Sequence, residues 1–166
     1  KSAATVAKLL VDIVSKNGNM LLSVPLRADG TPDEKELAIM KEFGAWMKIN
    51  SESIVKTRPW KIFGEGPIAD ADIQINAQGF NDGQYTKAGA NEIRFTQTEK
   101  NLYVSALEWP ENKTINVKSL AEGSTLYPEK IKSVELLGYG KVKFTRTANA
   151  LVVTLPEKLN NIMPVL

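Results

Sequence analysis

The almost unbroken apolar run Met20-Leu21-Leu22-Ser23-Val24 is the feature that most limits how this chain can fold. A strand without alternation buries both of its faces, as strands do in a parallel sheet covered by helices. The residues on either side of the run show helical spacing of apolar side chains. The run is therefore predicted to be a buried strand, and a buried strand needs sheet neighbours for its backbone groups.

The two predicted helices carry start and stop signals. The first is predicted from about Ser2 to Ser15 and ends at Lys16-Asn17-Gly18, where Asn or Gly suits a left-handed cap. The second begins with Thr31 as N-cap, followed by Pro32 and by Glu34 in a capping box. Its buried face is predicted to consist of Leu37, Met40, Phe43, Gly44 and Met47, with Trp46 at the edge.

The pattern changes to period two in the second half of the chain. Short alternating runs are separated by turn residues, and their apolar positions are Ile93, Phe95, Leu102, Val104, Ala106, Ile115, Val117, Val134, Leu136, Val142, Phe144, Leu151, Val153 and Leu155. This spacing predicts an antiparallel β-sandwich over residues 91–166. Residues 56–90 lack periodicity and are predicted to be an irregular connector.

The overall fold class is therefore predicted as α+β. We interpret residues 1–55 as a helix-strand-helix remnant of a (β/α) barrel, because this part of the chain supplies no neighbours for its strand. An alternative is a small self-contained α+β domain in which the strand joins the edge of the sandwich.

Composition excludes several kinds of chemistry. The 166 residues include no histidine and no cysteine, so this chain alone cannot build a Ser-His-Asp triad, a histidine metal site or a thiolate nucleophile. A formal net charge of +2 argues against a nucleic-acid partner. No run of about 18 apolar residues is present, so no membrane span is expected. We expect neither a cofactor nor a bound metal.

Several segments resemble one enzyme family. Both the Ser15-to-Asn19 stretch and Thr57-Arg58-Pro59-Trp60 are similar to the end of the catalytic barrel in α-L-fucosidases of glycoside hydrolase family 29. The similarity extends more weakly to the family's C-terminal β-sandwich, through the segments Ile93 to Thr96, Leu102 to Val104, Ser133 to Gly138 and Leu151 to Pro156.

The resemblance implies a fragment of a retaining enzyme that hydrolyses α-L-fucosides. In that family an Asp nucleophile, a Glu acid/base and a histidine-lined pocket lie upstream of the matched segments, so no catalytic residue is expected here. The implied partners are the missing N-terminal barrel, or a second copy, and fucosylated glycans through the parent enzyme. A periplasmic or extracellular location is implied. The alternative is a carbohydrate-binding or interaction β-sandwich without hydrolase activity.

Four residues are candidates for contact with a sugar. Arg27 and Asp29 follow the predicted strand, where the rim of a barrel active site is built, although Asp29-Gly30 also reads as a simple turn. Trp60 and Trp109 offer flat rings for carbohydrate stacking. Aromatic side chains of a small β-domain are more often used for packing, and we expect Trp60 to lie between the two parts of the chain.

Overall fold

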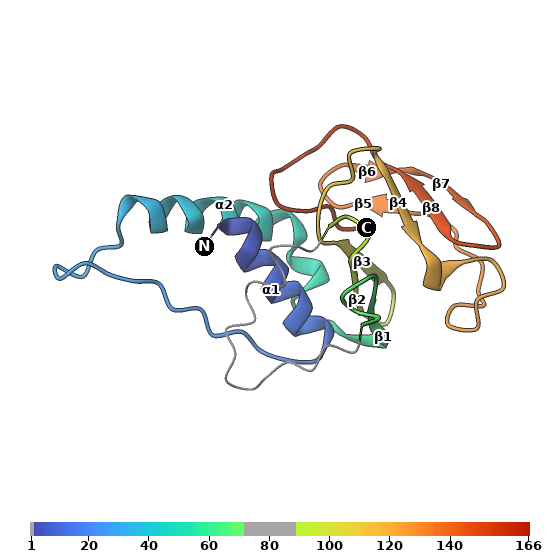
Figure 1. Cartoon of the computed structure of the whole chain (residues 1–166), viewed down its shortest axis with the longest axis horizontal. Coiled ribbons are helices and arrows are strands. Elements are labelled where there is room, and N and C mark those ends of the chain that lie inside the picture. The colour runs from blue at the N-terminus through green and yellow to red at the C-terminus, as the bar shows by residue number, and fades with distance from the viewer. Residues whose placement is uncertain (1, 72–88) are drawn as a thin grey trace.

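The computed structural model describes residues 2–71 and 89–166. Within these ranges the chain forms two helices, two short 3-10 turns and eight strands. Their bounds are α1 Ala3–Ser15, α2 Glu34–Asn50, η1 Ser51–Ser53, β1 Arg58–Glu65, β2 Ile93–Gln97, β3 Leu102–Ala106, β4 Thr114–Val117, η2 Lys118–Leu120, β5 Glu135–Leu136, β6 Gly140–Lys141, β7 Lys143–Arg146 and β8 Leu151–Thr154. The helices occupy one end of an elongated molecule and the strands the other (Figure 1).

Every strand pairing described is antiparallel. Two three-stranded sheets have the orders β1-β2-β3 and β4-β8-β7, and β5 and β6 form a separate hairpin. Helices and antiparallel sheets in one chain make the α+β class, as predicted.

The sheet β1-β2-β3 is the middle of three layers. On β2, Ile93 and Phe95 enter a core shared with the sheet β4-β8-β7. Arg94 and Thr96, which alternate with them, bond to the helical side: Arg94 to Asp12 of α1, and Thr96 to the Ser53 carbonyl after α2. Both faces of β2 are thus covered, the outer one by helices (Figure 1).

Two hydrophobic cores result from this layering. The first lies between the two three-stranded sheets, as expected of a sandwich, and its buried members include Trp60, Phe95, Ile115, Leu136 and Val153. The second lies between the helices and the outer face of β3, and its buried members are Ala3, Ala7, Val11, Trp46, Tyr103, Leu107, Ile162, Met163 and Val165.

Helix α1 has the caps that its sequence predicts. The Ser2 hydroxyl accepts a hydrogen bond from the Thr5 amide at 3.2 Å. At the other end Asn17 takes a φ of 65°, and the Gly18 amide donates to the Ile13 carbonyl at 2.8 Å, which is a Schellman motif. Asn17 therefore provides the left-handed cap.

Helix α2 differs from its prediction in two respects. Asp33, not Thr31, is the N-cap, and its carboxylate accepts from the Glu36 amide at 2.9 Å. The predicted buried face is wrong at Leu37, Met40 and Gly44, which are exposed. Trp46 is the apolar residue of α2 that is buried, at 1% exposure. The exposed half of α2 projects from the body of the molecule (Figure 1).

The predicted strand at Met20 to Val24 is absent from the structure. These residues belong to no sheet and lie in a long segment that leads away from α1 toward the start of α2 (Figure 1). The side chain of Leu21 is 96% exposed. A strand cannot form here because no described strand lies alongside to bond its backbone.

The predicted irregular connector, 56–90, is wrong where β1 lies. Arg58–Glu65 pairs with β2, with a register shift between Pro59 and Gly64. Proline and glycine mask such a strand in sequence, yet both are tolerated at an edge strand with an irregular register. Residues 72–88 of the connector lie outside the described residues. The division of the chain at 55 and 91 stays a prediction.

Residues 162–166 close the second core. The amides and carbonyls of Val104 and Leu166 bond reciprocally at 2.9 Å, so this segment runs antiparallel beside β3. The Trp46 indole donates to the Met163 carbonyl at 3.1 Å. The final segment therefore ties α2 to the middle sheet.

Candidate functional site

The loop that carries Arg27 and Asp29 is a tight, exposed turn. The Arg27 amide donates to the Thr31 carbonyl at 2.8 Å, and Gly30 takes a φ of 82°. One Asp29 oxygen accepts from the Thr31 amide at 3.0 Å and from the Thr31 hydroxyl at 2.7 Å. The hydrogen bond from the Thr31 amide lowers the pKa of Asp29 most, and the hydrogen bond from the Thr31 hydroxyl lowers it further.

These bonds match the reading of Asp29-Gly30 as a turn. A carboxylate with a lowered pKa is a poor proton donor at neutral pH, so Asp29 does not suit the acid role of a glycosidase. Both Arg27 and Asp29 are exposed. Their contact with a substrate stays a prediction.

The two candidate tryptophans lie in different surroundings. Trp60 is 8% exposed and packs against Phe95, with ring centroids 4.9 Å apart, inside the sandwich core. That packing leaves no free ring face for a sugar. Trp109 is partly buried against the same core, and its indole donates to Asn160 at 3.3 Å. Trp60 therefore packs within the sandwich and not between the two parts of the chain.

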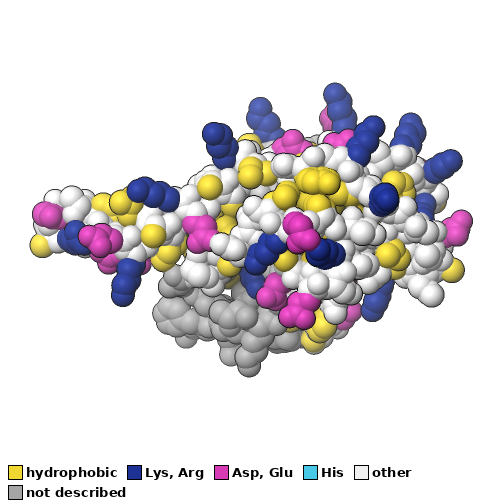
Figure 2. All heavy atoms as spheres, turned by 90° about the horizontal axis from the view of Figure 1, so that it is seen from above, with side chains coloured by type: hydrophobic (Ala, Val, Ile, Leu, Met, Phe, Trp, Pro, Cys, Tyr) yellow, Lys and Arg dark blue, Asp and Glu magenta, His cyan; other side chains and the backbone are white. Residues whose placement is uncertain are grey.

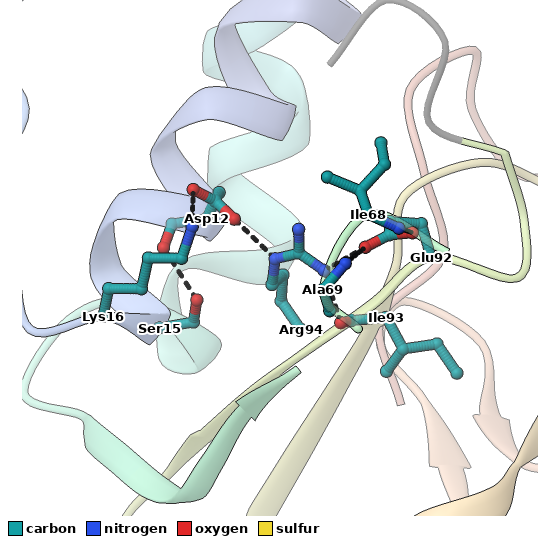
Figure 3. Close-up of polar contacts among 8 residues, drawn as sticks. All are labelled: Asp12, Ser15, Lys16, Ile68, Ala69, Glu92, Ile93 and Arg94. Atoms are coloured by element: carbon teal, nitrogen blue, oxygen red, sulfur yellow. Dashed lines mark hydrogen bonds and ion pairs between the residues drawn. The ribbon is translucent and has the colours of Figure 1, made fainter. Parts of the chain in front are cut away.

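A buried ionic cluster joins α1 to β2. Arg94 Nε donates to Asp12 Oδ1 at 2.5 Å, and Arg94 Nη1 donates to Glu92 Oε1 at 2.7 Å. All three side chains are at most 4% exposed. Lys16, on the outer side, bonds the second Asp12 oxygen at 2.8 Å (Figure 3).

Glu92 extends this cluster to the chain that follows β1. Its two carboxylate oxygens accept from the Ile68 and Ala69 amides, each at 2.8 Å (Figure 3). A Cβ added at Gly66, whose φ is 127°, would meet the Asn91 carbonyl at 2.4 Å. Glycine is therefore required where this segment approaches the start of β2.

The Arg94 side chain also lies against an aromatic ring. Its guanidinium carbon lies 5.5 Å from the Phe63 ring centroid, and Lys16 Nζ lies 4.7 Å from the same ring. Arg94 Nη2 is buried, and it has no hydrogen-bond partner among residues 2–71 and 89–166. The Phe63 ring and the carboxylates of Asp12 and Glu92 thus surround the Arg94 guanidinium, an arrangement suited to holding α1 and β2 together.

Asp12, Glu92 and Arg94 are residues that the sequence interpretation missed. Arg94 alternates with Ile93 and Phe95, so period two predicts that it faces solvent. The helical layer on the outer face of the sheet reverses that expectation. The one available signal was Asp12 within an otherwise apolar stretch of the first helix.

A second buried carboxylate holds the end of β1. Glu65 accepts from the Lys118 and Ser119 amides, each at 2.7 Å, and from the Ser119 hydroxyl. This links the middle sheet to η2 on the far side of the sandwich core. Such saturated hydrogen bonding is typical of a structural carboxylate rather than of a nucleophile.

Two hollows open on the surface of the strand end. One, of about 620 Å³, lies between β3, the loop 127–135 and Leu166, and we call it the Tyr127 hollow. The other, of about 710 Å³, is lined by Lys56, Arg58, Gln97, Thr98, Glu99 and Lys100. Lys100 borders both, so the two hollows are neighbours.

Family comparisons account for both parts of the chain. The model of the family described as "Alpha-L-fucosidase" matches residues 1–52, and the model described as "Alpha-L-fucosidase C-terminal domain" matches residues 87–166. The chain belongs to the α-L-fucosidase family. It is a fragment of such a protein, and the resemblance noted in the sequence is confirmed.

Individual relatives agree with this assignment. The mouse tissue α-L-fucosidase is 26% identical over 162 residues, covering 94% of this chain and 29% of the relative. The human tissue α-L-fucosidase is 28% identical over 154 residues, which cover 89% of this chain and 26% of the relative. The chain spans less than a third of the length of these two relatives.

The fold also has a solved counterpart. The crystal structure of the Thermotoga maritima α-fucosidase has a TM-score of 0.69 and 24% identity, with 99% of this chain and 34% of that chain covered. The helical part and the β-part together thus correspond to about one third of that structure.

Proposed function

We propose that this chain belongs to a protein that hydrolyses α-L-fucosides with retention, and that the 166 residues are its non-catalytic, supporting portion. The observation that carries the proposal is the order of the two family matches, with 1–52 matching the fucosidase model and 87–166 its C-terminal domain. The mouse and human relatives are named as α-L-fucosidases.

The carboxylates support a non-catalytic role. Retaining glycosidases place two carboxyl groups about 5–5.5 Å apart, one a nucleophile and one protonated. Here Asp12 and Glu92 are held by Arg94, and Glu65 is held by backbone amides. Asp29 is bonded to Thr31 within a turn. Each of these four carboxylates thus has a partner within the chain, which supports a structural role for it.

The partner that we propose is the preceding portion of the same protein. The segment 20–26 and the first half of α2 present exposed apolar side chains, namely Leu21, Leu22, Leu26, Leu37 and Met40. Figure 2 shows hydrophobic side chains among charges of both signs on this projecting end. Sheet neighbours from a barrel would cover these side chains. A second copy of the chain is the competing partner.

We also propose export of the parent protein to the periplasm or the cell exterior. The family resemblance is the support for this location. Within 2–71 and 89–166, neither helix has the length and apolar character needed to cross a bilayer. Fractionation of the source cells, followed by an immunoblot against the sandwich, tests the proposal. Recovery from the cytosol alone would overturn it.

An activity assay separates the parts of the proposal. The purified 166-residue chain is expected to release no aryl alcohol from an aryl α-L-fucoside. The longer protein that contains it is expected to hydrolyse the same substrate. Turnover by the short chain overturns the non-catalytic role. A longer protein that is folded but inactive toward fucosides overturns the proposed reaction.

A further inference from the structure

The Tyr127 hollow has an apolar floor and a charged rim. Its floor is formed by buried or partly buried side chains from both sheets and the final segment, namely Leu102, Val104, Leu120, Tyr127, Ile131, Val134, Leu137, Leu151 and Leu166. Its exposed rim comprises Glu52, Lys100, Asn101, Glu129, Lys130, Lys132, Ser133 and Glu135. At about 620 Å³ it lies within the size range of small-molecule sites.

The charges of the rim cancel. Three lysines and three glutamates line the rim, so the hollow attracts neither a polyanion nor a polycation. The same side chains supply many hydrogen-bond donors and acceptors in close alternation, and Asn101 and Ser133 add neutral ones. A neutral ligand rich in hydroxyl groups matches such a rim.

Tyr127 supplies a held aromatic ring in this hollow. The guanidinium carbon of Arg146 lies 5.9 Å from its ring centroid, and Arg146 Nη2 donates to the Tyr127 carbonyl at 2.5 Å. Arg146 Nε is in turn bonded to the Leu120 carbonyl at 2.9 Å. These contacts fix the tyrosine before any ligand arrives, which reduces the entropic cost of binding.

We infer that the Tyr127 hollow is a binding site for a neutral oligosaccharide. A pyranose ring has an apolar C–H face and a rim of hydroxyl groups, and these two parts correspond to the apolar floor and the mixed rim. The site is separate from the candidates Trp60 and Trp109, of which Trp60 is packed in the core. The inference rests on the hollow alone and does not require that the parent protein hydrolyse fucosides.

Titration calorimetry on the full 166-residue chain tests the site with three probes: a fucosylated neutral trisaccharide, maltotriose and a sulfated trisaccharide of equal length. Binding of at least one neutral probe is expected, with the sulfated probe no tighter. Amide shifts in a ¹⁵N spectrum are expected at residues 100–104 and 127–135. Absence of binding by both neutral probes, preference for the sulfated probe or shifts confined to other residues would overturn the inference.

Matched tyrosine variants separate binding from folding. Tyr127→Leu keeps an apolar floor and removes the ring, and it is expected to weaken the neutral probe about tenfold. Tyr139→Leu is the control, because Tyr139 is 56% exposed and does not line the hollow. If Tyr127→Leu lowers the melting temperature, Lys130→Met on the exposed rim serves as the binding-site variant in its place. Equal affinities in all the variants and the wild type would overturn the site.

Discussion

Arg94 on β2 bonds Asp12 on α1 across 82 positions of sequence, with 2.5 Å between Nε and Oδ1. The two side chains belong to the separate regions matched by the two family models. This buried ion pair therefore fixes the position of the helical part relative to the β-part.

Arg94→Met tests the strength of this link. The change removes the guanidinium that the buried Asp12 and Glu92 carboxylates share, while Asp12 keeps Lys16, and we expect the free energy of unfolding to fall by about 3–5 kcal/mol. Chemical denaturation followed by circular dichroism measures the change. Lys113→Met is the control, since the Lys113–Glu157 pair is exposed and worth about 1 kcal/mol or less. Equal losses in the two variants would refute the role given to Arg94.

A pair of glycine substitutions is expected to act in opposite directions. A Cβ at Gly64 would meet the Ile93 carbonyl at 2.4 Å, so Gly64→Ala should lower the free energy of unfolding by about 1–3 kcal/mol. Gly44 lies inside α2 with no atom within 4 Å of an added Cβ, and Gly44→Ala should raise it by about 0.5–1 kcal/mol. Thermal unfolding of the two variants compares them directly. Stabilisation by Gly64→Ala would show that β1 and β2 are not packed as described.

The N-cap of α2 should depend on pH. The Glu36 amide lowers the pKa of Asp33 below its ordinary value of 3.8. Its stabilising effect is therefore complete above about pH 4 and is lost as the pH falls through the folded-state pKa. Asp33→Asn removes this titration, so the difference in melting temperature between wild type and variant should shrink between pH 7 and pH 2.5. An unchanged difference would contradict the cap.

Leu21→Ser probes the exposed apolar segment. Leu21 is 96% exposed, so the free energy of unfolding of the variant should stay within about 0.5 kcal/mol of the wild-type value. If this segment receives a partner, the same change should weaken association between the chain and the preceding portion of the protein. Sedimentation velocity of a co-expressed pair measures that association. Identical sedimentation of variant and wild-type pairs would exclude the segment as the docking surface.

Trp46→Phe removes one donor from a buried site. The Met163 carbonyl would lose its bond to the indole, and we expect a cost of about 1–3 kcal/mol together with faster proteolysis of the final segment. Trp109→Phe removes a longer, partly buried bond to Asn160 and should cost less. A larger loss in Trp109→Phe would reverse this assignment.

Local signals predicted much of the fold. The Asn17 cap, the start of α1 and the positions of β2, β3, β4 and β8 all depend on neighbours in sequence, and the structure confirms them. Trp46 and β1 were misjudged because their burial depends on the final segment and on β2, which are distant in sequence.

The candidate site was less accessible to sequence reasoning. The turn at Asp29 could be foreseen because both bonding partners lie within two residues. The cluster of Asp12, Glu92 and Arg94 could not, since an alternating strand pattern does not reveal a helical layer over its outer face. Likewise, an apolar run at Met20 predicts a strand but does not say whether a neighbouring strand is present.

The segment 162–166 also constrains the order of folding during synthesis. Trp46 leaves the ribosome more than a hundred residues before its acceptor on Met163, so the helices emerge well before their core can close. Until residues 162–166 emerge, the apolar faces of α1 and β3 stay open to chaperones and proteases. Loss of residues 162–166 would thus leave the helical layer without the apolar side chains that close its core.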